Sequence, residues 1–175
     1  MAPTLWCQRR PCLITSLTDI PPFQVRNYAH GDIDALIDLF RKSVRILAGL
    51  DYTQEQVLAW APDYIDRSAW AARCANSQTF VAELQNSLVG FAIVEPDGHL
   101  DMMYVHPEHQ GKGIASALLE HVESFARRHG LARLYTEASV TARPYFEHRG
   151  FRPIAPQVVS GHGQDFINYR MEKQL

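Results

Sequence analysis

The sequence has few cysteines, and their spacing excludes most roles that cysteines play in small folds. Only three are present among 175 residues: Cys7, Cys12 and Cys74. An odd count without close metal-type spacing argues against a disulfide framework and against a zinc site. Because reduced thiols are typical of cytoplasmic proteins, we expect a cytoplasmic chain that holds no metal.

The sequence also lacks a long apolar run and an excess of charge of one sign. No stretch approaches the ~20 apolar residues that cross a bilayer, so we expect no membrane span. The segment after Arg9-Arg10 is short and carries Pro11, which argues against a signal peptide. There are 17 basic and 19 acidic residues, for a net charge of −2. Nucleic-acid binding usually needs a concentrated basic face, so we expect no nucleic-acid partner.

The length suits one domain, and no internal repeat or low-complexity tract divides it. We interpret residues 1–20, rich in proline and threonine, as an N-terminal extension. Residues 21–175 then form a single domain.

The first third of that domain has the patterns of one strand and three helices. Residues 23–27 alternate apolar and polar side chains, which predicts a strand. Apolar residues recur at helical spacing from Ile33 to Leu47, and Asp32 is expected to cap that helix. Thr53 and Gln56 have the spacing of a capping box, and a third helix is predicted over residues 68–75.

The rest of the chain has patterns of strands interrupted by two helices. Turn signals at 85–87 and 96–98 predict an antiparallel meander. A long helix to about residue 129 and another strand complete a crossover unit, which favours parallel pairing of the flanking strands. The predicted strands are 79–84, 88–95, 99–105, 133–138, 151–160 and 165–171, with a short helix over 141–148. These elements predict a mixed α/β, or α+β, fold.

The loop at residues 110–115 (Gln-Gly-Lys-Gly-Ile-Ala) joins a predicted strand to the long helix. The first amides of a helix have no internal partners and can bind a phosphate, whose charge the helix dipole favours. Two glycines let a ligand approach the backbone closely, and Lys112 adds positive charge. A plain tight turn is the alternative. The spacing matches neither a P-loop nor a dinucleotide-binding fingerprint.

Two motifs resemble a known family. Gln110-x-x-Gly113-x-Ala115 resembles motif A of the GNAT acetyltransferases, and Ser139-x-x-Ala142-x-x-Tyr145-Phe146 resembles motif B. The likeness covers residues 23–172 and includes the predicted element order. Residues 141–147 and 168–173 are more loosely similar to the YafP-like branch of that family.

The resemblance implies a central, mostly antiparallel twisted sheet with helices on both faces, and acetyl-CoA as co-substrate. The fourth and fifth strands should splay apart so that the cofactor fills the gap. The backbone of Met103 and Val105 should pair with its pantetheine arm, and the Val105 amide should polarise the thioester. The cofactor-binding residues that the resemblance implies are Met103, Tyr104, Val105, Gln110, Gly111, Lys112, Gly113, Ile114, Ala115, Ser139, Ala142, Tyr145 and Phe146.

The groups that move protons are left open by the sequence. His99 occupies the position where the family often has a carboxylate base, and Asp101 lies on the same strand face; both can instead be solvated surface groups. The family usually has Phe-Tyr in motif B, whereas this chain has Tyr145-Phe146. Phe146 cannot donate a proton, so Tyr145 either acts as the acid or packs in the core. Ser139 replaces the family's common asparagine.

The function that the resemblance implies is transfer of an acetyl group from acetyl-CoA to a primary amine by direct attack in a ternary complex. We expect the acceptor to be a small-molecule or protein amine, and the protein to be a monomer or homodimer. A non-catalytic acyl-CoA sensor is the alternative. A toxin that acetylates charged tRNA has little support from the mixed charge. Aromatic side chains that could line the acceptor pocket or pack in the core are Tyr52, Trp60, Tyr64, Trp70, Phe166 and Tyr169.

Overall fold

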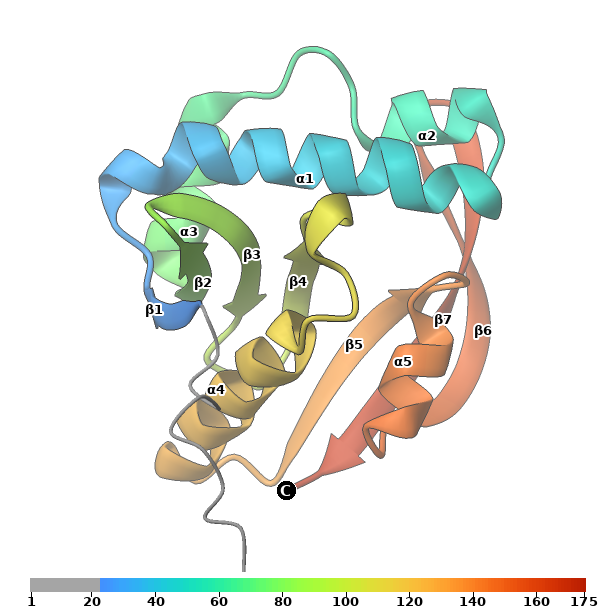
Figure 1. Cartoon of the computed structure of the whole chain (residues 1–175). Coiled ribbons are helices and arrows are strands. Elements are labelled where there is room, and N and C mark those ends of the chain that lie inside the picture. The colour runs from blue at the N-terminus through green and yellow to red at the C-terminus, as the bar shows by residue number, and fades with distance from the viewer. Residues whose placement is uncertain (1–22) are drawn as a thin grey trace, which may run out of the picture.

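The computed structural model describes residues 23–175 (Figure 1). The expected extension at 1–20 therefore lies outside the described residues, as do Cys7 and Cys12, whereas Cys74 is a buried free thiol. The helices and strands follow in the order β1 Gln24–Asn27, α1 Ile33–Leu47, α2 Gln54–Trp60, α3 Arg67–Asn76, β2 Gln78–Leu84, β3 Ser87–Val94, β4 Leu100–Val105, α4 Ile114–Arg128, β5 Arg133–Ser139, α5 Arg143–His148, β6 Arg152–Gly161 and β7 Gln164–Gln174. Short 3-10 segments stand at His30–Asp32, Ala48–Leu50 and Pro107–His109.

The strands form two antiparallel sheets, ordered β1-β2-β3-β4 and β5-β7-β6. The first is the predicted meander with β1 added at its edge. Parallel pairing between β4 and β5 was expected along the strands, but it is limited to one bridge between His99 and Tyr135. Just beyond it the Thr136 hydroxyl, not a backbone amide, donates to the Leu100 carbonyl oxygen at 2.8 Å. The two strands therefore separate, as the family resemblance implies.

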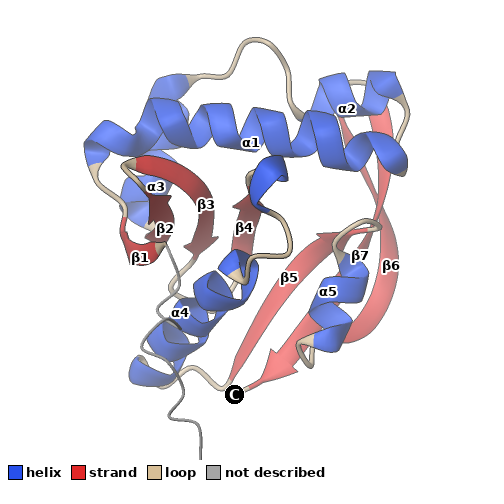
Figure 2. Cartoon of the chain, viewed as in Figure 1, coloured by secondary structure: helices blue, strands red, loops and turns tan. Residues whose placement is uncertain are grey.

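Helices cover both faces of the first sheet, which confirms the mixed α+β fold (Figure 2). On one face Leu36 and Phe40 of α1 pack with Phe91 of β3 in a buried cluster. On the other face Leu118 and Val122 of α4 belong to a second cluster, which also includes residues of β5 and α5. Each fully buried side chain of this size stabilises the fold by about 1.5–3 kcal/mol. No helix within residues 23–175 is long and apolar enough to cross a membrane.

Of the two helix caps predicted from the sequence, one is confirmed and the other is wrong. The capping box at α2 is confirmed, because the Gln56 amide donates to Thr53 Oγ1 at 3.2 Å and the Thr53 amide donates to Gln56 Oε1 at 2.9 Å. Asp32 stands at the start of α1 but does not cap it with its side chain. Its carboxylate instead accepts from the Ala29 amide at 2.7 Å and from Arg26, because a 3-10 turn precedes the helix.

Gly90 on β3 lets α4 approach the sheet. A Cβ atom added there would lie 2.8 Å from Ile114 Cγ2, 3.0 Å from Leu118 Cδ1 and 3.2 Å from the Tyr104 carbonyl oxygen. Any larger residue must push α4 away from β3. Because α4 begins at Ile114, this contact also sets the position of the loop before it.

We expect Gly90→Ala to lower the free energy of unfolding by about 1–3 kcal/mol, the usual cost of overpacking a core. Urea unfolding followed by circular dichroism measures this. Gly161→Ala is the matched control, because Gly161 is also in a strand and an added Cβ meets nothing within 4 Å. Equal effects of the two substitutions would show that the Gly90 contact with α4 does not limit packing.

Candidate functional site

The loop between β4 and α4 has an open backbone held by two glycines. Gly111 and Gly113 have φ angles of 72° and 81°, in the left-handed region that glycine adopts without strain. An added Cβ at either would meet nothing within 4 Å, so conformation, not space, requires glycine here. The first bond of α4 runs from the Ala117 amide to the Gly113 carbonyl at 3.0 Å. The preceding amides at the start of the helix therefore have no carbonyl partner one turn earlier.

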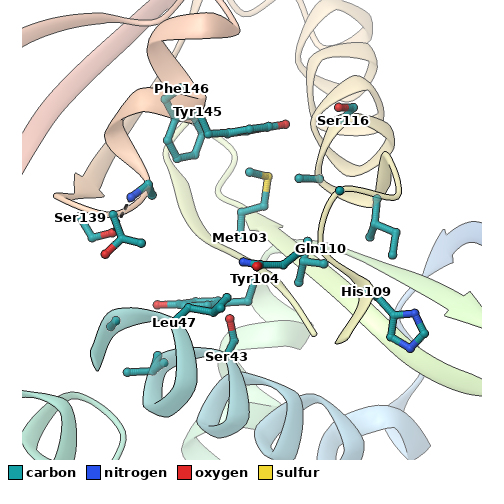
Figure 3. A pocket seen from close by; sticks show the side chains of 18 of the residues that line it. Ser43, Leu47, Met103, Tyr104, His109, Gln110, Ser116, Ser139, Tyr145 and Phe146 are labelled. Atoms are coloured by element: carbon teal, nitrogen blue, oxygen red, sulfur yellow. Dashed lines mark hydrogen bonds between the residues drawn. The ribbon is translucent and has the colours of Figure 1, made fainter. Parts of the chain in front are cut away.

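A cavity of about 570 Å³ lies beside this loop, between β4 and β5 (Figure 3). Every cofactor-binding residue inferred from the sequence lines it except Lys112, whose Nζ lies 3.1 Å from His109 Nδ1. The structure thus brings the two motifs together from opposite sides of the opening. The lining residues are Ser43, Val44, Leu47, Ala48, Trp60, Met103, Tyr104, Val105, His109, Gln110, Gly111, Gly113, Ile114, Ala115, Ser116, Ser139, Thr141, Ala142, Tyr145 and Phe146.

The edge of β4 that faces this cavity carries backbone groups of alternate residues. The His106 amide donates to the Val89 carbonyl at 2.9 Å, and Tyr104 is opposite Phe91 in the β3–β4 ladder. In an antiparallel pair, alternate residues direct their N–H and C=O groups to the same neighbour. The backbone groups of Met103 and Val105 therefore face away from β3, toward the opening.

Tyr145 and Phe146 differ in their surroundings although they are adjacent on α5. Phe146 is 5% exposed and packs edge-on against Phe151, with ring centroids 5.1 Å apart. Tyr145 extends across the cavity toward Ser116 on α4 (Figure 3). Its buried hydroxyl has no hydrogen-bond partner within the described part of the chain. Burial raises the pKa of Tyr145 and outweighs the opposite effect of Arg149 and Ser116, so the hydroxyl keeps its proton at neutral pH.

Sequence reasoning missed the wall that α1 contributes through Ser43 and Leu47, because only long-range packing brings this helix to the loop. Hydrogen bonds tie the segment after α1 to the second sheet. The Tyr52 hydroxyl donates to the Ile167 carbonyl at 3.0 Å and accepts from the Val140 amide at 3.1 Å. The Thr141 hydroxyl donates to Asp51 at 2.6 Å.

A second cavity of about 370 Å³ adjoins the first and shares Trp60, Tyr104 and Ser139 with it. Burial raises the pKa of Tyr104 and outweighs the opposite effect of a hydrogen bond with Trp60. Its hydroxyl is therefore a proton donor at neutral pH. The second cavity is lined by Tyr52, Ala59, Trp60, Arg73, Asp101, Met102, Tyr104, Glu137, Ser139, Val159, Gly161, His162, Phe166 and Asn168.

The candidate bases lie at and beside this second cavity. Asp101 lines it, and both of its oxygens accept from Arg73, at 2.5 and 2.6 Å. The β3–β4 pairing skips Asp101, which is the extra residue of a β-bulge. A bulge changes the direction in which the side chain of the extra residue points. His99 is not among the lining residues of either cavity. Its Nε2 is 2.6 Å from Glu137, which does line the second cavity, and its Nδ1 is 3.1 Å from Glu95.

Sequence reasoning did not select Glu137. A signal was available, because Glu137 precedes Ser139 by two residues on a strand and therefore shares its face. Partial burial alone would lower the pKa of His99, but hydrogen bonds to Glu137 and Glu95 outweigh it and raise that pKa overall. Among residues 23–175 no cluster of three or more potential metal ligands has metal-binding geometry.

Proteins of similar structure share this arrangement of elements. A Gcn5-related N-acetyltransferase from Rhodopseudomonas palustris superposes with a TM-score of 0.83 at 35% identity, over 87% of this chain and 95% of that one. The PaiA N-acetyltransferase from Thermoplasma acidophilum, solved in complex with coenzyme A, has the same fold, with a TM-score of 0.73 at 18% identity over 87% of this chain and 99% of its own.

Sequence comparison leads to the same family. YafP from Escherichia coli K12, described as an uncharacterized N-acetyltransferase, is 37% identical over 148 residues, which is 85% of this chain and 93% of that protein. The family of acetyltransferase (GNAT) domains matches residues 49–173, and that span contains both motifs and the β4–α4 loop. The chain is therefore a member of the GNAT family of N-acetyltransferases.

Proposed function

We propose that this protein transfers the acetyl group of acetyl-CoA directly to a primary amine while both substrates are bound. The observation that carries the proposal is the pair of adjoining cavities, which share Trp60, Tyr104 and Ser139 at the opening between β4 and β5. One cavity ends at the start of a helix, where free amides can bind a diphosphate. The other contains carboxylates, which can bind the ammonium group of an amine. Two substrates held side by side react without a covalent enzyme intermediate.

The first cavity suits the acetyl-CoA molecule along its length. The diphosphate would accept hydrogen bonds from the amides at the start of α4, and the pantetheine arm would pair with Met103 and Val105. The Val105 amide would then donate to the thioester oxygen and stabilise the negative charge that develops there. That PaiA binds coenzyme A on the same fold supports this assignment.

The transfer requires two proton losses and one proton gain. The acceptor ammonium loses a proton, and its nitrogen attacks the carbonyl carbon of the thioester. The C–N bond forms, the C–S bond breaks, and the nitrogen loses its second proton. The coenzyme A thiolate takes up one proton, so that one proton is released overall. We propose that Tyr145 supplies the proton to sulfur, because its hydroxyl is buried in the first cavity without a partner.

His99 and Asp101 remain the proposed participants on the amine side, and the structure suggests how each acts. Both oxygens of Asp101 already accept hydrogen bonds from Arg73, so neither is left open toward an amine. Glu137 faces the second cavity and is held by His99. We therefore propose that Glu137 takes the proton and that His99 is its positioning residue. The buried thiol of Cys74 is compatible with the proposed cytoplasmic location.

Gly113→Asp should weaken acetyl-CoA binding by at least about 10²-fold, because a carboxylate beside the diphosphate adds like-charge repulsion of several kcal/mol. Isothermal titration calorimetry measures the affinity. Gly130→Asp is a matched control at the other end of α4, since Gly130 also has a positive φ angle of 68° and open space around it. Equal affinities for the two variants would remove the β4–α4 loop from the binding site.

Tyr145→Phe should lower kcat by about 10²-fold, the usual contribution of a general acid, and leave the Kd of acetyl-CoA unchanged. Thiol release in the steady state measures kcat. Tyr64→Phe removes the same hydroxyl from a tyrosine that is 83% exposed and lines neither cavity, so it should retain full kcat. An unchanged kcat in Tyr145→Phe would contradict the acid role. Coenzyme binding by the wild-type protein without turnover of any amine would favour the acyl-CoA sensor.

His99 should make stability depend on pH. Its pKa is raised above the ordinary 6.5, so the stabilisation that the protonated ring gains from Glu95 and Glu137 is complete below pH ~6.5 and is lost as the pH rises through the raised value. The difference in unfolding free energy between wild type and His99→Asn should therefore be largest in mild acid and shrink in alkali. Urea unfolding across that pH range measures it, and a constant difference would contradict the ion-pair assignment.

A further inference from the structure

The two carboxylates that line the second cavity differ in how many of their oxygens are hydrogen-bonded. Arg73 is the one Lys or Arg side chain among its lining residues, and Asp101 accepts from two of its nitrogens. Glu137 bonds His99 through one oxygen, while its other oxygen has no hydrogen-bond partner within residues 23–175. The cavity therefore presents one Glu137 oxygen that accepts no hydrogen bond within residues 23–175, and its arginine is already paired with Asp101.

Asn168 adds a second acceptor that lacks a donor. It is opposite Ser139 in the β5–β7 ladder, at the end of β5 where both cavities meet. Its buried Oδ1 atom has no hydrogen-bond partner in the described part of the chain. A buried carbonyl oxygen without a donor is unfavourable, so a ligand that donates there is favoured.

Three aromatic side chains also line the second cavity. Tyr52, Trp60 and Phe166 contact one another with ring centroids 5.5 to 6.2 Å apart, at the junction of α2 and the β6–β7 hairpin. The Gln56 side chain donates to the Asp165 carbonyl at 2.6 Å and fastens the hairpin to α2. These rings offer contact to an apolar or aromatic body, and an ammonium group beside them gains cation–π attraction.

We propose that the second cavity accepts a primary alkylammonium compound with an apolar, ring-sized body and no carboxylate next to the amine. The ammonium donates to Glu137 and to Asn168 Oδ1, and the three aromatic rings pack against the body. An α-amino acid is disfavoured, because its carboxylate would meet Glu137 while Arg73 is held by Asp101. This substrate class rests on the proposed acetyl transfer and goes beyond it.

Matched acceptor pairs test the proposal: phenethylamine against phenylalanine, and tyramine against tyrosine, which differ only by the carboxylate. Thiol release by the full chain should give a kcat/KM about 10²-fold higher for each amine, since a carboxylate buried without a partner is costly. Asp101→Asn frees Arg73 and should lower that preference at least tenfold. Equal rates for amine and amino acid, or a preference that Asp101→Asn leaves unchanged, would overturn the proposal.

Glu137→Gln provides a second variant if Asp101→Asn does not fold. It should raise the KM of phenethylamine at least tenfold and leave the calorimetric Kd of acetyl-CoA unchanged; an unchanged KM would overturn the proposal. Calorimetry of the wild-type protein distinguishes failure of the proposed acetyl transfer from failure of the proposed substrate class. Absence of heat with acetyl-CoA overturns the acetyl transfer itself. Normal binding with no turnover of either amine overturns only the substrate class.

Discussion

The parallel bridge between His99 and Tyr135 joins the two sheets at one point, and the site depends on the separation that begins there. Beside it the Tyr135 amide donates to the Gly98 carbonyl at 3.1 Å. Gly98 is held there with φ 94°, and an added Cβ would lie 2.5 Å from the Arg133 carbonyl oxygen. Beyond this bridge, the edge of β4 that faces away from β3 has no neighbouring strand among residues 23–175. An unpaired edge binds extended chains through its backbone, which is the physical basis for placing the pantetheine arm there.

The same separation explains why two cavities meet. A continuous sheet would place β5 against β4 and close the space between Tyr104 and Ser139, which now belong to both cavities. The segment after α1 and the β6–β7 hairpin then cover the opening, held by the hydrogen bonds of Tyr52 with Val140 and Ile167. Adjoining cavities covered in this way can hold two molecules close together and partly shielded from water.

The two carboxylates of the second cavity differ in how fully their oxygens are hydrogen-bonded. Asp101 is neutralised by both arms of Arg73, and Glu137 retains an oxygen for a ligand. In the sequence, His99 stood out by its position six residues before Val105, and Asp101 because it shares the strand face of His99. Glu137 did not, because its approach to His99 is a contact between strands 38 residues apart. Sequence position therefore selected this end of β4 but not the carboxylate that keeps an unbonded oxygen.

The sequence by itself determined the local elements and the loop chemistry. The apolar spacing from Ile33 to Leu47 predicts α1, and the two glycines before Ile114 predict the open loop before α4. Both features depend only on residues close together in the sequence. The tertiary structure alone decided that α1 forms a wall of the first cavity, and that β7 lies between β5 and β6. It also decided that the Tyr145 hydroxyl, not Phe146, crosses the first cavity. Adjacent residues on a helix point about 100° apart, so packing of Phe146 on Phe151 sets where Tyr145 points.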